Sequence, residues 1–297
     1  HDAEHHASHG VDALRTFALS LAKGESHRPD VLALLGDQVY ADETSPEMHD
    51  FIASRRDIDE PPGEEIKDYA EYAHLYQLAW SDPAIRWVLS VVPSAMIFDD
   101  HDIRDDWNTS WSWHQEINRT PWWHERLVAG LTSYWVHQHI GNLAPEELAR
   151  DEIWRRLEGA APGEVDLTGP LRALAEQVDR HPERYRWSYT RALGGSRLVM
   201  LDSRAARVLE PERRAMLDDD ELAWLDEQLT GDLDHLFIGT SLPFLLPPGL
   251  HDAEAISEAL AGPGRSRPVR RATEVVRQAV DLEHWGAFSS GFVEVFE

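Results

Sequence analysis

The sequence predicts an α/β fold built from helices and mixed β-sheets. Two apolar runs of strand length, residues 30–35 and 88–98, each follow a helical pattern and end in acidic residues. This alternation of helices and strands is typical of βαβ units with parallel strands. Further along, two alternating runs joined by Gly194-Gly195 predict a β-hairpin. Because a hairpin pairs antiparallel strands, we expect mixed sheets.

The second apolar run ends in an acidic stretch, Asp99–Asn108, which contains five aspartates and His101. Open α/β sheets keep their ligand sites at the carboxyl ends of strands. Carboxylates this close together repel one another unless a positive charge lies among them, and a bound cation is the usual solution. The alternative, which this stretch alone leaves open, is a solvated acidic loop.

The first apolar run ends in a similar way, at Gly36-Asp37, and Tyr40 follows three residues later. If the two strands are neighbours in a parallel sheet, Asp37 and Asp100 lie at the same edge of that sheet. Gly36 would let the backbone turn sharply and leave room for an ion or ligand. The alternative for Gly36 is an ordinary turn from strand to loop.

The composition limits the classes of partner and ligand. The 297 residues are 42% hydrophobic, enough for a large core, and the formal charge of −26 makes nucleic acid and anionic membranes poor partners. No cysteine is present, so any metal must be bound through oxygen and nitrogen. No apolar run reaches the roughly 20 residues of a membrane span, and no secretion signal opens the chain. We therefore expect a soluble protein and favour the cytoplasm over export; the sequence does not indicate the oligomeric state.

The other elements follow from hydrophobic periodicity and turn residues. Helices are expected over residues 11–21, 69–80, from 83 onward, 127–140, 144–157, 169–180, 221–229 and 273–282. Strands are expected over residues 186–193, 196–204, 235–239 and 291–296. Loops are expected over residues 44–65 and 242–249.

We expect residues 107–180 to form a helical insert within one domain that spans residues 1–297. Six of the twelve tryptophans lie between Trp107 and Trp135. Such a cluster can line a pocket, or it can pack the insert against the body of the domain. The sequence leaves both interpretations open.

Five sequence motifs occur in an order that can be compared with known families. They are Gly36-Asp37-Gln38-Val39-Tyr40, Phe98-Asp99-Asp100-His101-Asp102, Leu201-Asp202-Ser203-Arg204, the helix from Met216-Leu217 to Trp224-Leu225, and Asp281-Leu282-Glu283-His284-Trp285. Together they resemble the PhoD-like (alkaline phosphatase D) family of the metallophosphoesterases, over nearly the whole chain from about Val11. The resemblance implies a four-layer α/β/β/α sandwich with a metal site at the strand ends between two sheets.

The resemblance also implies roles for five residues. Asp37 would bridge two metals, Tyr40 would be a phenolate ligand suited to ferric iron, and Asp100 would be a further metal ligand. His101 would be the catalytic histidine that helps the leaving oxygen depart. Arg204 is a candidate clamp for the substrate phosphate, and the alternative is that it pairs with a neighbouring acid. The metals implied are Fe³⁺ and Ca²⁺, with Mn²⁺ or Zn²⁺ as alternatives, and such a pair acidifies a bound water and holds phosphoryl oxygens.

Two parts of the family's pattern are missing from the sequence. One is a strand with Ser-Cys that supplies a thiolate ligand, and the other is a Gly-Asp-Val-His segment after the last helix. We therefore expect a domain that is incomplete at both ends and belongs to a longer enzyme; the alternative is a homologue that has lost full metal loading. Residues 1–297 alone are expected to bind at most one metal tightly and to turn over phosphoesters poorly or not at all.

We thus expect a metal-dependent phosphatase or phosphodiesterase that hydrolyses a small or polymeric phosphoester with a metal-activated water. The alternative is a non-enzymatic cation-binding or interaction module of the same fold. An oxygen-only calcium cage has no use for an imidazole, so His101 favours the enzyme.

Overall fold

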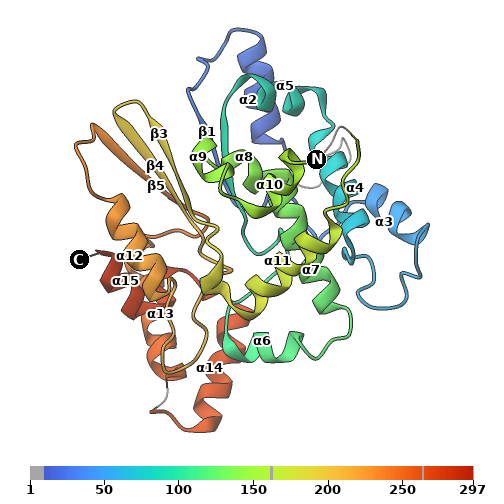
Figure 1. Cartoon of the computed structure of the whole chain (residues 1–297). Helices are drawn as coiled ribbons and strands as arrows, with labels where there is room; N and C mark the ends of the chain where they lie inside the picture. Colours follow the sequence, from blue (N-terminus) through green and yellow to red (C-terminus); the bar gives the residue numbers. More distant parts are fainter. Residues whose placement is uncertain (1–9, 161–162, 263, 297) are drawn as a thin grey trace.

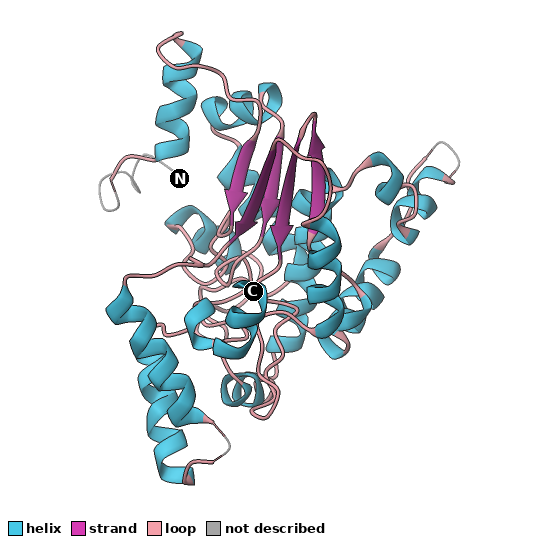
Figure 2. Cartoon of the chain, turned by 90° about the vertical axis from the view of Figure 1, so that its left-hand side faces the viewer, coloured by secondary structure: helices cyan, strands magenta, loops and turns pink. Residues whose placement is uncertain are grey.

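The computed structural model describes residues 10–160, 163–262 and 264–296, and it confirms the mixed α/β class. Strands β1 (Leu32–Leu35) and β2 (Ser94–Ile97) form a parallel two-stranded sheet. A second sheet has the order β3-β4-β5. Its strands are β3 (Tyr189–Leu193), β4 (Ser196–Leu201) and β5 (His235–Thr240). Helices surround both sheets, and loops gather at one end of the strands (Figures 1 and 2).

The second sheet is the mixed one. Strand β3 pairs antiparallel with β4, and Leu193 lies opposite Ser196, so Gly194-Gly195 is the two-residue hairpin that the sequence predicts. Strand β4 pairs parallel with β5. The pairing of β3 with β4 confirms the hairpin prediction. Gly194 in the turn has a positive φ of 66°, which glycine adopts at no steric cost.

The two faces of β4 pack against different parts of the molecule, as alternation along a strand requires. Leu198 and Met200 belong to the largest core cluster, together with Ile97 of β2. Val199 and Leu201 instead pack with Leu225 of α12 (Asp219–Gln228). The sheets are also joined by a hydrogen bond in which the Tyr189 hydroxyl donates to the Met96 carbonyl over 2.9 Å. The full four-layer order stays a prediction.

Two helices, one that precedes β1 and one that precedes β2, pack beside β1. Ala18 of α2 (Ala13–Ala22) and Val88 of α5 (Pro83–Val91) form a buried cluster against which Leu32 packs. The remaining helices up to the second sheet are α3 (Pro46–Ala53), α4 (Tyr69–Trp80), α6 (Trp111–Ile117), α7 (Trp123–Tyr134), the π-helix η1 (Trp135–His139), α8 (Ile140–Asn142), α9 (Pro145–Leu148), α10 (Glu152–Glu158), α11 (Thr168–Arg180) and η2 (Pro182–Arg184). Those near the chain end are α13 (Pro248–Ala261), α14 (Arg267–Ala279), η3 (Trp285–Ala287) and α15 (Ser289–Phe296).

Two stretches predicted as non-helical contain helices. The loop expected over residues 44–65 includes α3, because Ser45 caps its N-terminus, Pro46 occupies the first turn, and Met48 and Ile52 are fully buried. The apolar run 88–98 is a strand only from Ser94 to Ile97, since α5 continues to Val91. A short apolar run fits a helix and a strand equally well, so tertiary packing decides.

The strand predicted for residues 291–296 is wrong, because α15 occupies this stretch. Phe292 and Val295, three residues apart and therefore on one helix face, pack on the core cluster that contains Trp285. The helix predicted for residues 144–157 is two helices, α9 and α10, because Asp151 caps a new N-terminus by accepting from Ile153 N and Trp154 N.

Helices fill the region predicted as an insert. From Trp111 to Arg180 the described residues form helices and turns, and the next strand begins at Tyr189. Trp107, Trp113, Trp123 and Trp135 are buried in the largest core cluster, so the tryptophans pack this region against the body of the domain. Whether residues 107–180 are a separate insert stays a prediction. Among the helices described, none is long and apolar enough to cross a membrane.

Candidate active site

The parallel pairing of β1 and β2 brings both acidic stretches to one edge. Leu35 lies opposite Ile97, so Gly36-Asp37 and the residues after Phe98 leave the sheet side by side. Gly36 has φ 109°, and a Cβ on it would lie 2.6 Å from the Cβ of Asp99. Only glycine tolerates this approach, so the Gly36 backbone sets the distance between Asp37 and the second acidic stretch.

Three carboxylates meet at this edge. Asp37, Asp99 and Asp100 each place one oxygen within 4.8 Å of the others. Burial, together with the charges of Asp99 and Asp100, raises the pKa of Asp37 to about 7. Burial and the charge of Glu283 raise the pKa of Asp100 to about 6, against the opposing effect of Arg204. The protein therefore holds Asp37 and Asp100 where burial and neighbouring charges disfavour the ionised carboxylate.

One oxygen of this cluster is left without a partner. Asp37 Oδ1 is buried and accepts no hydrogen bond from any described residue. Asp37 also has a positive φ of 52°, which is uncommon for a residue other than glycine. Hard carboxylate oxygens in close contact are the ligands that divalent and trivalent cations prefer, so the residues present fit a metal ion.

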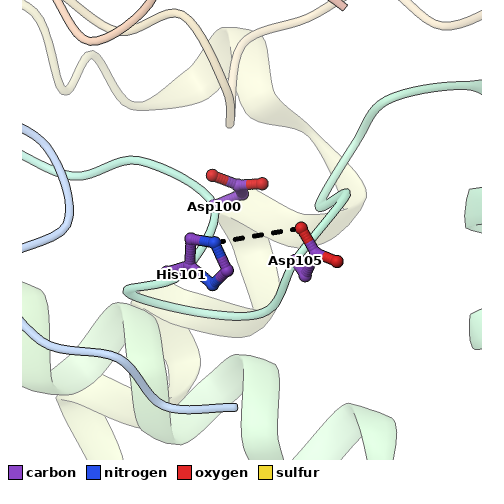
Figure 3. A group of neighbouring side chains, drawn as sticks. All are labelled: Asp100, His101 and Asp105. Carbon is purple, nitrogen blue, oxygen red and sulfur yellow. Dashed lines mark ion pairs between the residues drawn. The ribbon is translucent and has the colours of Figure 1, made fainter. Parts of the chain in front are cut away.

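His101 lies beside this cluster between two further carboxylates. Its Nδ1 is 3.0 Å from both oxygens of Asp42, and its Nε2 is 3.9 Å from Asp105 (Figure 3). Burial lowers the pKa of His101, but the hydrogen bond and charge of Asp42, with the charges of Asp100 and Asp37, outweigh it and raise the pKa to about 9. The imidazole is therefore protonated at neutral pH.

Tyr40 stacks on the His101 ring, with the ring centroids 4.4 Å apart. Burial and the charges of Asp37 and Asp100 raise the pKa of the Tyr40 hydroxyl to about 12. The phenol is therefore neutral without a cation nearby, and a bound cation would favour the phenolate. Asp100, His101 and Asp105 form a second group whose ligand atoms lie within 4.8 Å of one another.

Arg204 is buried among the same carboxylates. Its Nε donates to Asp99, its Nη2 lies 3.1 Å from Asp100, and its Nη1 and Nη2 each donate to Glu283 over 2.5 Å. Burial alone would raise the pKa of Glu283, but Arg204 and Arg207 lower it to about 2. The guanidinium thus supplies a fixed positive charge to the acid cluster.

All five residues singled out in the sequence meet here, and the structure adds others. Asp42, Asp99 and Glu283 were not assigned roles, although each has direct contacts with His101 or Arg204. Asp42 lies two residues after Tyr40, and Glu283 lies in the last of the five motifs. The sequence shows these residues but not which of the many acids turns inward.

A family model described as PhoD-like phosphatase matches residues 14–234 of this chain. The chain belongs to the PhoD-like phosphatase family. The predicted membership is therefore confirmed, and an acidic group able to hold a metal lies within the matched residues of this PhoD-like chain.

The PhoD-like chain was also compared with solved structures and curated proteins. A structure described as "Structure of PhoD" is 15% identical, with a TM-score of 0.48. The match covers 79% of this chain and 39% of that one. No match was found among the curated proteins.

Proposed function

We propose that the protein hydrolyses phosphate mono- or diesters in a metal-dependent reaction at the edge where β1 and β2 end. The observation that carries this proposal is the unpartnered buried oxygen of Asp37, set among carboxylates and next to His101. A merely solvated acidic loop would leave such an oxygen in water. Membership of a phosphatase family supports the same reaction.

Asp37 and Asp100, with Tyr40 beside them, would hold the metal. Fe³⁺ and Ca²⁺ are the ions that we propose, with Mn²⁺ or Zn²⁺ as alternatives. When bound, the metal supplies the Lewis acidity that activates a water and neutralises the charge of phosphoryl oxygens. Asp99 can serve as a further ligand because its carboxylate shares the cluster with Asp37 and Asp100.

His101 is suited to donate a proton to the leaving oxygen. Asp42 accepts from Nδ1, which fixes the ring and leaves Nε2 on the side of Asp105. The side chain of Asp42 is 7% exposed, whereas that of Asp105 is 66% exposed, so Nε2 lies on the solvent side. A protonated imidazole fixed in this way can act as a general acid.

Arg204 as a clamp for the substrate phosphate also stays a proposal. Its observed contacts are with Asp99, Asp100 and Glu283, and its side chain is 1% exposed. A phosphate that reaches Arg204 would therefore exchange with one of these carboxylates. Without that exchange, Arg204 positions Asp100 instead.

The test is hydrolysis of aryl phosphate mono- and diesters by the full-length protein. We expect the protein to turn over these esters. A chelator should abolish the turnover and added metal should restore it, and the Asp37→Asn variant should have lost it. Asp59→Asn, an exposed aspartate away from the site, is the matched control and should keep full activity. Turnover that is indifferent to both chelator and Asp37→Asn contradicts the proposal. Metal binding without turnover would instead favour a cation-binding module of the same fold.

A further inference from the structure

A cavity of about 400 Å³ lies among α6, α11 and residues 205–210, apart from the carboxylate cluster. Its floor is apolar, formed by Leu127, Leu131 and Val178, which are all nearly fully buried. Helices α7 and α11, which carry these side chains, lie against each other (Figure 1). The cavity therefore offers a dry surface to the apolar part of a ligand.

Two indole rings line the cavity. Trp107 is 3% exposed and Trp111 is 39% exposed, so one belongs to the interior and the other stands at the opening. Trp111 also stacks with His114, with the ring centroids 6.2 Å apart. The negative face of an indole attracts cations, and Trp is the aromatic side chain that does so best.

The charges at the opening leave two carboxylates unmatched. Among the described residues, the carboxylates of Asp179 and Glu210 form no hydrogen bond and have no cation within 4 Å. Burial raises the pKa of Asp179, against the charges of His114, His124 and Arg180, none of which is paired with it within 4 Å. Burial lowers the pKa of His114, against the charges of Asp179 and Glu210, so this imidazole offers the two acids little positive charge near neutral pH.

The two arginines that also line the cavity are already paired. Arg207 donates to the carbonyls of Ser203, Asn108 and Glu283, and it lies 3.5 Å from the Glu283 carboxylate. Arg180 lies 3.6 Å from Glu176 on the preceding turn of α11. Both arginines are therefore engaged by other groups. Among the described residues that line the cavity, Asp179 and Glu210 are the carboxylates without a partner within 4 Å.

We propose that this cavity binds an organic cation, namely an ammonium group carried on an apolar body of the size of a phenylethyl group. The ammonium lies at the opening between Asp179, Glu210 and the face of Trp111, and the apolar body lies on the leucine floor. Cation–π contact and a half-buried carboxylate both favour a positive ligand over a neutral one of equal shape.

The cavity shares a wall with the candidate active site. Trp107 and Asn108 end the stretch that carries Asp100 and His101, and Asn108 donates from Nδ2 to the Arg204 carbonyl over 3.2 Å. The cation can therefore come from two sources: the alcohol part of the phosphoester substrate, or a free amine that acts as an effector. The first source rests on the proposed function, whereas binding itself does not.

The experiment is isothermal titration calorimetry of the full chain with 2-phenylethylammonium and with 2-phenylethanol, its neutral counterpart. We expect the amine to bind at least about tenfold more tightly than the alcohol. Asp179→Asn and Trp111→Leu should each weaken amine binding by about five- to tenfold, with little change in melting temperature. Glu212→Gln, an exposed acid two residues beyond Glu210, is the control and should bind like wild type.

Equal affinity for amine and alcohol, amine binding unchanged by both variants, or no binding up to about 10 mM would each overturn the proposal. These readouts need no catalytic activity, so they stand even if the proposed hydrolysis fails. If the protein hydrolyses an aryl phosphate, competitive inhibition by the amine would show that the cavity binds the alcohol part of the substrate. A change in turnover without competition would show that the amine acts as an effector.

Discussion

His101 lies between a carboxylate in the interior and one at the surface, and this asymmetry defines what a single substitution should do. Asp42 fixes the ring from inside, while Asp105 stays mostly in solvent. We expect His101→Ala to lower the turnover of phosphoesters by about 10²- to 10⁴-fold, the usual loss for a general acid or base. The fold should also lose some stability at neutral pH, because Asp42 is 7% exposed and would keep the N–H of Asp105 as a donor but lose its charged partner. Steady-state kinetics and thermal unfolding check both parts.

The control for this prediction is another histidine outside the site. His235→Ala, on the exposed strand β5, should keep wild-type turnover. If His101→Ala stays within about twofold of wild type, the general-acid role of His101 is wrong.

At the scale of elements, α7 depends on a glycine that packs against the acidic stretch. A Cβ on Gly130 would lie 2.4 Å from Ile103 Cδ1 and 2.8 Å from the Tyr72 hydroxyl. We expect Gly130→Ala to reduce the free energy of unfolding by about 1–3 kcal/mol, although alanine favours helices, because the overpacked contact outweighs helix propensity. Urea denaturation measures the change.

Gly141 in α8 is the matched control. A Cβ there would meet no atom within 4 Å. Gly141→Ala should therefore stabilise the protein by about 0.4–1 kcal/mol, since only the helix propensity and the unfolded state change. Equal effects of the two substitutions would mean that α7 does not pack on Ile103 as described.

The π-helix η1 buries a histidine with a direct consequence for pH dependence. His139 is 1% exposed among Tyr134, Tyr185 and Trp187, and burial lowers its pKa to about 3. The unfolded chain binds a proton there near pH 6.5, so between about pH 6.5 and 3 the unfolded state holds more protons. This part of the stability is present above pH 6.5 and falls with the pH by up to about 1.4 kcal/mol per unit.

We expect His139→Phe to lose this contribution. Its free energy of unfolding should change by about 2 kcal/mol less than that of wild type between pH 7 and pH 5. Urea denaturation at both pH values measures the difference. A His139→Phe variant with the wild-type pH dependence would show that the imidazole takes up its proton in the folded state.

Which elements the sequence predicts depends on whether the pattern is local. The helix 69–80 matches α4 because its aromatic residues follow helical spacing, and the hairpin at Gly194-Gly195 is encoded in the turn itself. Residues 291–296 form the helix α15 rather than the predicted strand. The contacts that stabilise this helix are with distant residues such as Phe244, which the local pattern does not show. The same limit applies to the site. Asp37 and Asp100 were predictable from strand ends, whereas Glu283 turns inward through its pairing with the distant Arg204 and Arg207.

At the scale of the whole molecule, a strong negative charge makes a bound cation a source of stability. The formal charge is −26, and burial raises the pKa values of Asp37 and Asp100 in the cluster. We expect micromolar Mn²⁺ or Ca²⁺ to raise the melting temperature. At a hundredfold excess over its dissociation constant, the bound ion should add about 2.7 kcal/mol to the free energy of unfolding. Differential scanning fluorimetry measures the shift.

Asp37→Asn separates binding from general screening of charge. The variant should lose the shift with Mn²⁺, while NaCl at equal ionic strength should leave both proteins nearly unchanged. In chelator at pH 8 the variant should be more stable than wild type by about 1–3 kcal/mol, because a buried carboxylate with its pKa raised to about 7 is replaced by an amide. A variant that still gains stability from Mn²⁺ would place the cation elsewhere.

The contacts of Arg204 also bear on when the site forms during synthesis. Arg204 joins Asp99, 105 residues before it, and Glu283, 79 residues after it. Contacts between such distant residues form late, since the chain between them must first be ordered. At roughly 5–20 residues per second, a ribosome adds Glu283 several seconds after Arg204. The nascent chain therefore carries its acidic stretch without the complete Arg204 network during that interval, and the site takes its final form only when the segment around Glu283 docks.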